Sequence, residues 1–188
     1  MHYDIADSIS HAGHYTPHLR LENIVSTSTM IPDEYLRVLK KIVSRLAGHH
    51  FNWAVTGSLG MALQGVPLPV HDIDLQTDKE GALGIARLFA EYVVNPVTLR
   101  ESEHIRSYFG VLEIDGIKVE IMGNLQKHLG EQEWEYPVQV ELYRRWVEYG
   151  GLKIPVLDLE YEYQAYLKMG RLERAALLRQ WLDRAHAG

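Results

Sequence analysis

Apolar residues recur at regular spacings along most of the chain after residue 30. Apolar residues spaced three or four positions apart predict helices, whereas strict alternation of apolar and polar residues and short apolar runs predict strands. Glycines and paired prolines mark the breaks between these segments. In the first half, the pattern predicts a helix from residue 32 to Gly48, a strand over 51–57, a helix over 58–64, a loop over 66–70, a strand over 72–77 and a helix over 79–93.

A hairpin is the strongest local prediction in the second half. Asp115-Gly116 separates two runs of strand character, 107–114 and 117–122. This dipeptide suits a type I′ turn, which needs positive φ at both central positions. The remaining predictions are strands over 97–101 and 152–158, a stretch of mixed character over 124–157, and one long helix, or two with a break near Gly170, from 159 to about 185.

The bulk composition fits a single globular domain. The chain has 188 residues, of which 46% are hydrophobic and 23% charged, so it can bury a core of ordinary size. We divide it into an irregular N-terminal extension (1–30), a core (31–157) and a C-terminal helical segment (158–188). We expect the last two parts to pack together as one domain.

Charge and cysteine content exclude several classes of protein. The net charge of −6 disfavours a nucleic-acid binder. Because the chain has no cysteine, disulfides, thiolate metal sites and cysteine nucleophiles are excluded. The N-terminus does not have the pattern of a signal peptide, and no apolar run approaches the length of a membrane span. We therefore expect a cytoplasmic protein with no membrane segment.

The N-terminal extension holds three histidines, His11, His14 and His18, at spacings that raise the question of a metal site. A zinc site needs ligands that the backbone holds in place, and no helix or strand is predicted here. We therefore favour the interpretation that they are solvated loop histidines.

Two aspartates share one face of the strand predicted over 72–77. Because side chains alternate along a strand, Asp72 and Asp74 point to the same side, with Cα atoms about 6.5 Å apart. In the second arm of the hairpin, Glu120 is a carboxylate in an otherwise apolar strand. If the two strands are neighbours and these faces coincide, three carboxylates converge and require a counter-ion. A pair of Mg²⁺ ions would supply it, as in sites for in-line phosphoryl transfer.

The Gly57-Ser58 pair supplies the other half of a phosphate site. Glycine at a strand end lets the backbone approach an anion, and the first turn of the following helix offers free N–H groups. The Ser58 hydroxyl adds a donor. A nucleoside triphosphate would bridge phosphate-binding groups here and metal ions at the carboxylates.

This set of residues resembles a known superfamily. Gly57-Ser58, then Asp72-Ile73-Asp74 after a gap of 13 residues, and a later strand carboxylate, Glu120, are similar to the nucleotidyltransferases of the DNA polymerase β type. The resemblance is closest to the small bacterial branch, which includes aminoglycoside, lincosamide and toxin–antitoxin nucleotidyltransferases. It covers residues 51–123 best. It implies an α+β fold in which a mixed β-sheet is flanked by helices, with further helices at the C-terminus.

The resemblance also implies an activity. The family transfers a nucleoside monophosphate from a nucleoside triphosphate such as ATP to a hydroxyl group, on a small molecule or an RNA end, and releases pyrophosphate. Carried over, Asp72, Asp74 and Glu120 are the catalytic residues and bind two Mg²⁺ ions, with Mn²⁺ as an alternative. Glu120 would also serve as the base. Gly57, Ser58 and Lys168 would bind the nucleotide.

The chain departs from the family pattern at two places. Leu68 and Val70 stand where many relatives have an arginine and a hydroxyl residue. Lys168 is followed by Arg171, but not by the Lys-Asp pair that relatives often have, so an exposed helical lysine is an equal alternative for Lys168. A second class of function also stays open: a non-catalytic or antitoxin-like module of the same fold that binds a protein partner. The sequence does not predict the acceptor, the preferred base or the oligomeric state.

Overall fold

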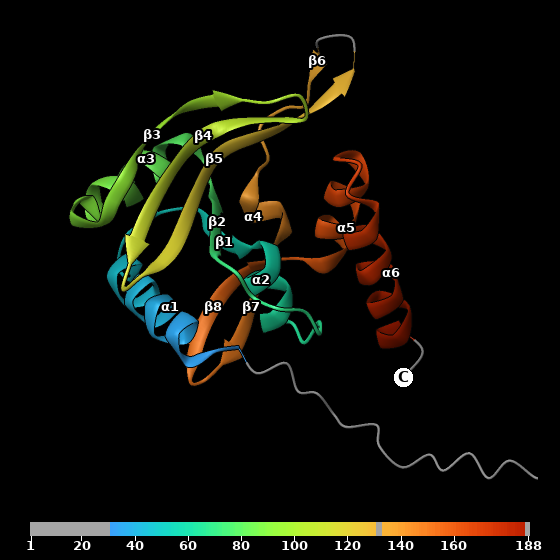
Figure 1. The fold of residues 1–188 in the computed structure, drawn as a ribbon, viewed down its shortest axis with the longest axis horizontal. Coiled ribbons are helices and arrows are strands. Elements are labelled where there is room, and N and C mark those ends of the chain that lie inside the picture. The colour runs from blue at the N-terminus through green and yellow to red at the C-terminus, as the bar shows by residue number, and fades with distance from the viewer. Residues whose placement is uncertain (1–30, 131–132, 187–188) are drawn as a thin grey trace, which may run out of the picture.

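A mixed β-sheet organises the fold in the computed structural model, which describes residues 31–130 and 133–186 (Figure 1). In these residues the sheet has eight strands, of which seven follow the order β3-β4-β5-β2-β1-β8-β7 and the eighth, β6, pairs with β5. The β2–β5 and β1–β8 pairs are parallel, and the others are antiparallel. The strands are β1 (Trp53–Thr56), β2 (Ile73–Thr77), β3 (Val93–Glu101), β4 (Ile105–Ile114), β5 (Ile117–Gly130), β6 (Glu133–Trp134), β7 (Arg144–Tyr149) and β8 (Leu152–Leu157).

Two groups of helices flank the strands, and the first of them lies against the sheet (Figure 1). The first group, α1 and α3, contacts β5, and α3 also contacts β3 and β4. In the second group, α5 packs on α6, and Trp181 of α6 reaches Gly65 just after α2. The helices are α1 (Asp33–Leu46), α2 (Gly57–Leu63), α3 (Lys79–Leu88), the 3₁₀ helix η1 (Ala90–Tyr92), α4 (Val140–Tyr143), α5 (Leu159–Lys168) and α6 (Leu172–His186).

The main core joins the sheet to the first group of helices and also includes buried residues of α2, α5 and α6. Leu39 and Ile42 of α1 and Ile85 of α3 are fully buried in the same cluster as Val119 and Ile121 of β5. Along β5, buried residues alternate with partly exposed ones. One face of this strand therefore belongs to the core, and the opposite face is left free for other chemistry.

The predicted fold class is confirmed: the structure is α+β, with a mixed sheet flanked by helices and two C-terminal helices. Asp115 and Gly116 have φ of 52° and 79°, as the predicted turn requires. The C-terminal helix is interrupted at Gly170, whose φ is 68°. The predictions for residues 1–30, including that for the three histidines, concern residues outside the described part of the chain.

Three local predictions need correction. The strand predicted from Asp72 begins at Ile73, so Asp72 lies just before β2. The helix over 79–93 ends at Leu88, because the β-branched pair Val93-Val94 already belongs to β3. The stretch of mixed character over 124–157 contains β7, which was not predicted. Its largely exposed residues lack the regular alternation of a half-buried strand. Across 31–130 and 133–186, no helix has both the length and the apolar character to cross a membrane.

Candidate active site

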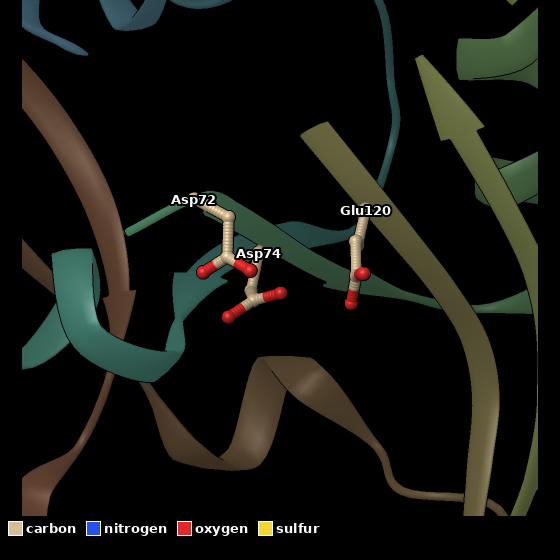
Figure 2. Close-up of side chains that lie close together, drawn as sticks. All are labelled: Asp72, Asp74 and Glu120. Atoms are coloured by element: carbon tan, nitrogen blue, oxygen red, sulfur yellow. The ribbon is translucent and has the colours of Figure 1, made fainter. Parts of the chain in front are cut away.

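Three carboxylates converge on one side of the sheet. Asp74 of β2 lies directly opposite Glu120 of β5, and Asp72 comes two residues before Asp74. One carboxylate oxygen from each residue lies within 4.8 Å of the other two. Figure 2 shows the three side chains directed into the same space. The structure thus brings together the carboxylates that the sequence pattern placed on two separate strands.

The register of the parallel β2–β5 pair explains this convergence. Ile73 pairs with Val119 and Leu75 with Ile121, and all four side chains are buried in the core. Because side chains alternate along each strand, the intervening pair, Asp74 and Glu120, must point to the other face. A shift of one residue in either strand would turn the carboxylate of that strand into the apolar core. The hydrophobic pattern therefore positions the acidic residues.

The cluster concentrates negative charge in a partly buried place. Burial and, after it, the charges of Asp72 and Glu120 raise the pKa of Asp74 from 3.8 to about 8. Lys118 forms ion pairs with Glu120 at 2.8 Å and with Asp72 at 3.0 Å. Its hydrogen bonds to Glu120 and then Asp72 raise the pKa of the ammonium group. One ammonium does not balance three carboxylates, so the arrangement favours a further cation.

The turn that joins β1 to α2 is built against Asp74. Gly57 has φ of 64°, a conformation that favours glycine. A Cβ atom at this position would lie 2.1 Å from Asp74 Oδ2. Ser58 follows and is buried, and its Oγ has no hydrogen-bond partner among the described residues. A buried hydroxyl without a partner is uncommon, and it marks a place where a bound ligand would supply one.

A buried glutamate in α5 holds the β1–α2 turn in place through hydrogen bonds. Glu162 accepts hydrogen bonds from the Thr56 hydroxyl and from the Gly57 N–H, the latter at 3.2 Å. Burial raises the pKa of Glu162 to about 7. This residue was not among those predicted from the sequence. A signal was present, since Glu162 lies on the apolar face of its helix, between Leu159 and Tyr166.

A cavity of about 370 Å³ joins these parts. Its walls include the three carboxylates and the Gly57-Ser58 turn, and Arg171 and Arg174 line it from the C-terminal helices. Lys168, predicted to bind the nucleotide, does not line this cavity. It forms an ion pair with Glu135 and borders a second cavity of about 810 Å³. Two arginines therefore supply the positive wall of the first cavity.

The donor set at the carboxylates fits a hard divalent cation. Mg²⁺ prefers oxygen ligands, usually one or two carboxylates together with water and substrate phosphates. The cluster offers carboxylate oxygens from Asp72, Asp74 and Glu120 at close spacing. The unpartnered Ser58 Oγ lies in the same cavity. The residues present thus suit an ion that is shared with a phosphorylated ligand.

Comparisons with known structures show a shared fold. The TM1012 protein of Thermotoga maritima, named only as a nucleotidyltransferase, is 59% identical, and the match covers 82% of this chain and 96% of that one with a TM-score of 0.74. ANT(2'')-Ia, solved in complex with adenylyl-2''-tobramycin, is 12% identical, with a TM-score of 0.52 over 79% of this chain and 90% of that one, which shows a shared fold. No protein of curated function matches significantly.

The family itself is shown by a match that spans most of the sequence. Residues 38–179 match the family described as aminoglycoside-2''-adenylyltransferase. This range contains β1, β2 and β5, which carry the site, and most of the C-terminal helical segment. The chain belongs to the aminoglycoside-2''-adenylyltransferase family and is a nucleotidyltransferase.

Proposed function

We propose that this protein transfers a nucleoside monophosphate from a Mg²⁺-bound nucleoside triphosphate to a hydroxyl group of a small molecule. The observation that carries the proposal is the convergence of three carboxylates beside the Gly57-Ser58 turn in one cavity. ATP is the expected donor, because the family is described by adenylyl transfer. The net charge of −6 favours a small acceptor over an RNA end.

Asp72, Asp74 and Glu120 would hold the metal, as one ion or a pair. Bound there, Mg²⁺ would polarise the α-phosphate and neutralise charge on the leaving pyrophosphate. Mn²⁺ has similar ligand preferences and should substitute. The raised pKa of Asp74 is consistent with a site that needs a cation to keep all its carboxylates ionised.

The rest of the cavity would hold the triphosphate. The Ser58 hydroxyl is a free donor, and the guanidinium groups of Arg171 and Arg174 can form charge-assisted hydrogen bonds with phosphate oxygens. These arginines would take the role that the family resemblance gave to Lys168. Glu162 would keep the turn in place through its hydrogen bonds to Thr56 and Gly57.

The transfer itself is a displacement at the α-phosphorus. Glu120, on the partly exposed face of β5, would accept the proton of the acceptor hydroxyl. The acceptor oxygen forms a bond to the α-phosphorus, and the bond from that phosphorus to the bridging oxygen of the β-phosphate breaks. Pyrophosphate leaves with the electron pair of the broken bond.

Transfer of label from α-³²P nucleotides to a panel of hydroxylated amino sugars and other small alcohols tests this proposal. We expect a labelled product from ATP with Mg²⁺, none with EDTA, and a loss of about a hundredfold or more in Asp74→Asn. Asp33→Asn, on the exposed start of α1, is the matched control and should retain activity. Transfer that persists in Asp74→Asn would contradict the site. Protein-partner binding without any nucleotide transfer would favour the non-catalytic module.

A further inference from the structure

A lysine occupies the mouth of the carboxylate cluster. Lys118 lies two residues before Glu120 on β5, so both side chains rise from the same face of the strand. Its Nζ lies 2.8 Å from Glu120 Oε1 and 3.0 Å from Asp72 Oδ2. The ammonium group therefore bridges carboxylates that come from two different segments of the chain.

These contacts engage two of the three carboxylates that could hold a metal ion. A carboxylate oxygen that accepts a hydrogen bond from an ammonium group has fewer lone pairs for a cation. Two positive charges within a few ångströms of each other also repel strongly where solvent is partly excluded. Lys118 and a divalent cation at this cluster are thus competitors for Asp72 and Glu120.

The surroundings of Lys118 allow it to leave. Its side chain is 50% exposed, whereas those of Asp72 and Glu120 are 23% and 24% exposed. A long side chain at the surface can move its charged end into water with little loss of packing. Arg171 and Arg174 line the same cavity. Among the described residues, however, the side chain that forms ion pairs with the carboxylates is that of Lys118.

We infer that Lys118 is a built-in counter-ion, which stabilises the carboxylate cluster in the metal-free protein and is displaced when a divalent cation binds. In this arrangement Lys118 lowers the affinity of the free protein for metal, so that metal arrives most readily together with the negatively charged nucleotide. The inference rests on the metal site of the proposed function, but not on nucleotide transfer.

Binding of Mn²⁺ alone tests the inference, with free Mn²⁺ measured by electron paramagnetic resonance in a titration of the full-length protein. We expect Lys118→Met, which keeps the apolar stem and removes the charge, to bind Mn²⁺ on the order of tenfold more tightly than the wild type. Lys118→Arg should resemble the wild type. Lys41→Met is the matched control, because Lys41 forms an exposed ion pair with Asp115 at the turn of the same hairpin.

Thermal unfolding adds a second readout that does not depend on activity. In EDTA, Lys118→Met should melt below the wild type because the carboxylates lose their counter-ion, and Mn²⁺ should raise its Tm by more than it raises that of the wild type. Unchanged or weaker Mn²⁺ binding in Lys118→Met would overturn the inference, as would equal shifts in Lys41→Met. Failure of transfer in a wild type that binds Mn²⁺ would contradict the proposed function and leave this inference standing.

Discussion

The carboxyl group of Asp74 lies where burial and neighbouring carboxylates all oppose a negative charge. These effects raise its pKa from 3.8 to about 8 in the folded protein. Between these two values the folded state holds a proton that the unfolded chain releases. The stability of the metal-free protein therefore falls as pH rises through this window, and the group's unfavourable contribution is complete above the folded pKa.

Urea unfolding in EDTA from about pH 5 to about pH 9 measures this effect. We expect the free energy of unfolding of the wild type to fall with rising pH, and that of Asp74→Asn to fall less, because the amide does not ionise. Glu162, whose pKa is raised to about 7, contributes in the same direction in both proteins. Mg²⁺ should flatten the wild-type curve. Parallel curves for the two proteins would show that Asp74 is not the titrating group.

Gly57 is a position where the backbone and the site constrain the residue type together. Gly57→Ala places a methyl group at positive φ and 2.1 Å from Asp74 Oδ2. We expect a loss of about 1–2 kcal/mol from the backbone alone, a further loss from displacement of the carboxylate, and at least about tenfold weaker nucleotide binding.

Gly48→Ala is the matched control for this change. Gly48, just after α1 and outside the 370 Å³ cavity, has φ of 81°, but a Cβ atom there would meet nothing within 4 Å. It should therefore show the backbone loss alone, with normal nucleotide binding. Chemical denaturation gives the stability difference, and calorimetric titration gives the affinity. Equal effects of the two substitutions on nucleotide binding would contradict the close approach of Gly57 to the site.

At the scale of elements, the buried side chain of Glu162 connects α5 to the β1–α2 turn through hydrogen bonds. Glu162→Ala would leave the Thr56 hydroxyl and the Gly57 N–H without their acceptor. Because both donors are buried, we expect a loss of about 1–3 kcal/mol in the free energy of unfolding and a higher KM for the nucleotide. Glu162→Gln keeps one acceptor oxygen and should retain part of both properties.

Glu160→Ala provides the comparison within the same helix. Glu160 is exposed and bonds to Gln164 one turn away, so its removal should change stability by less than about 0.5 kcal/mol. Urea denaturation of the three variants checks the order. A Glu162→Ala protein as stable as Glu160→Ala, with an unchanged KM, would show that α5 does not support the turn.

Helices and strands were predicted correctly where the apolar residues have one clear spacing or a turn motif is present. The spacing of Leu39 and Ile42 in α1 and the Asp115-Gly116 turn are local signals, and the structure confirms both elements. The edge strand β7 was missed, because a strand with little buried surface shows no alternation of apolar residues. Glu162 was missed for a related reason: its partners lie more than a hundred residues away.

At the scale of the whole molecule, the site is assembled from segments that are distant in sequence. The β1–α2 turn, the start of β2, the middle of β5 and the two C-terminal helices all reach the 370 Å³ cavity. The motif Gly57-Ser58 with Asp72 and Asp74 indicated the end of this cavity that holds the carboxylates. Its other wall, with Arg171 and Arg174, depends on how α5 and α6 pack, and the helical pattern alone does not predict that packing.

Metal-dependent nucleotide binding tests the central claim most directly. ATP, GTP, CTP and UTP would be titrated calorimetrically into the full-length protein with Mg²⁺ and with EDTA, alongside Asp74→Asn and the exposed control Asp33→Asn. We predict that ATP binds with Mg²⁺, that EDTA and Asp74→Asn each abolish binding, and that Asp33→Asn leaves it unchanged. Binding that persists in EDTA and in Asp74→Asn, or no binding of any of the four nucleotides, would contradict the carboxylate cluster as the centre of nucleotide transfer.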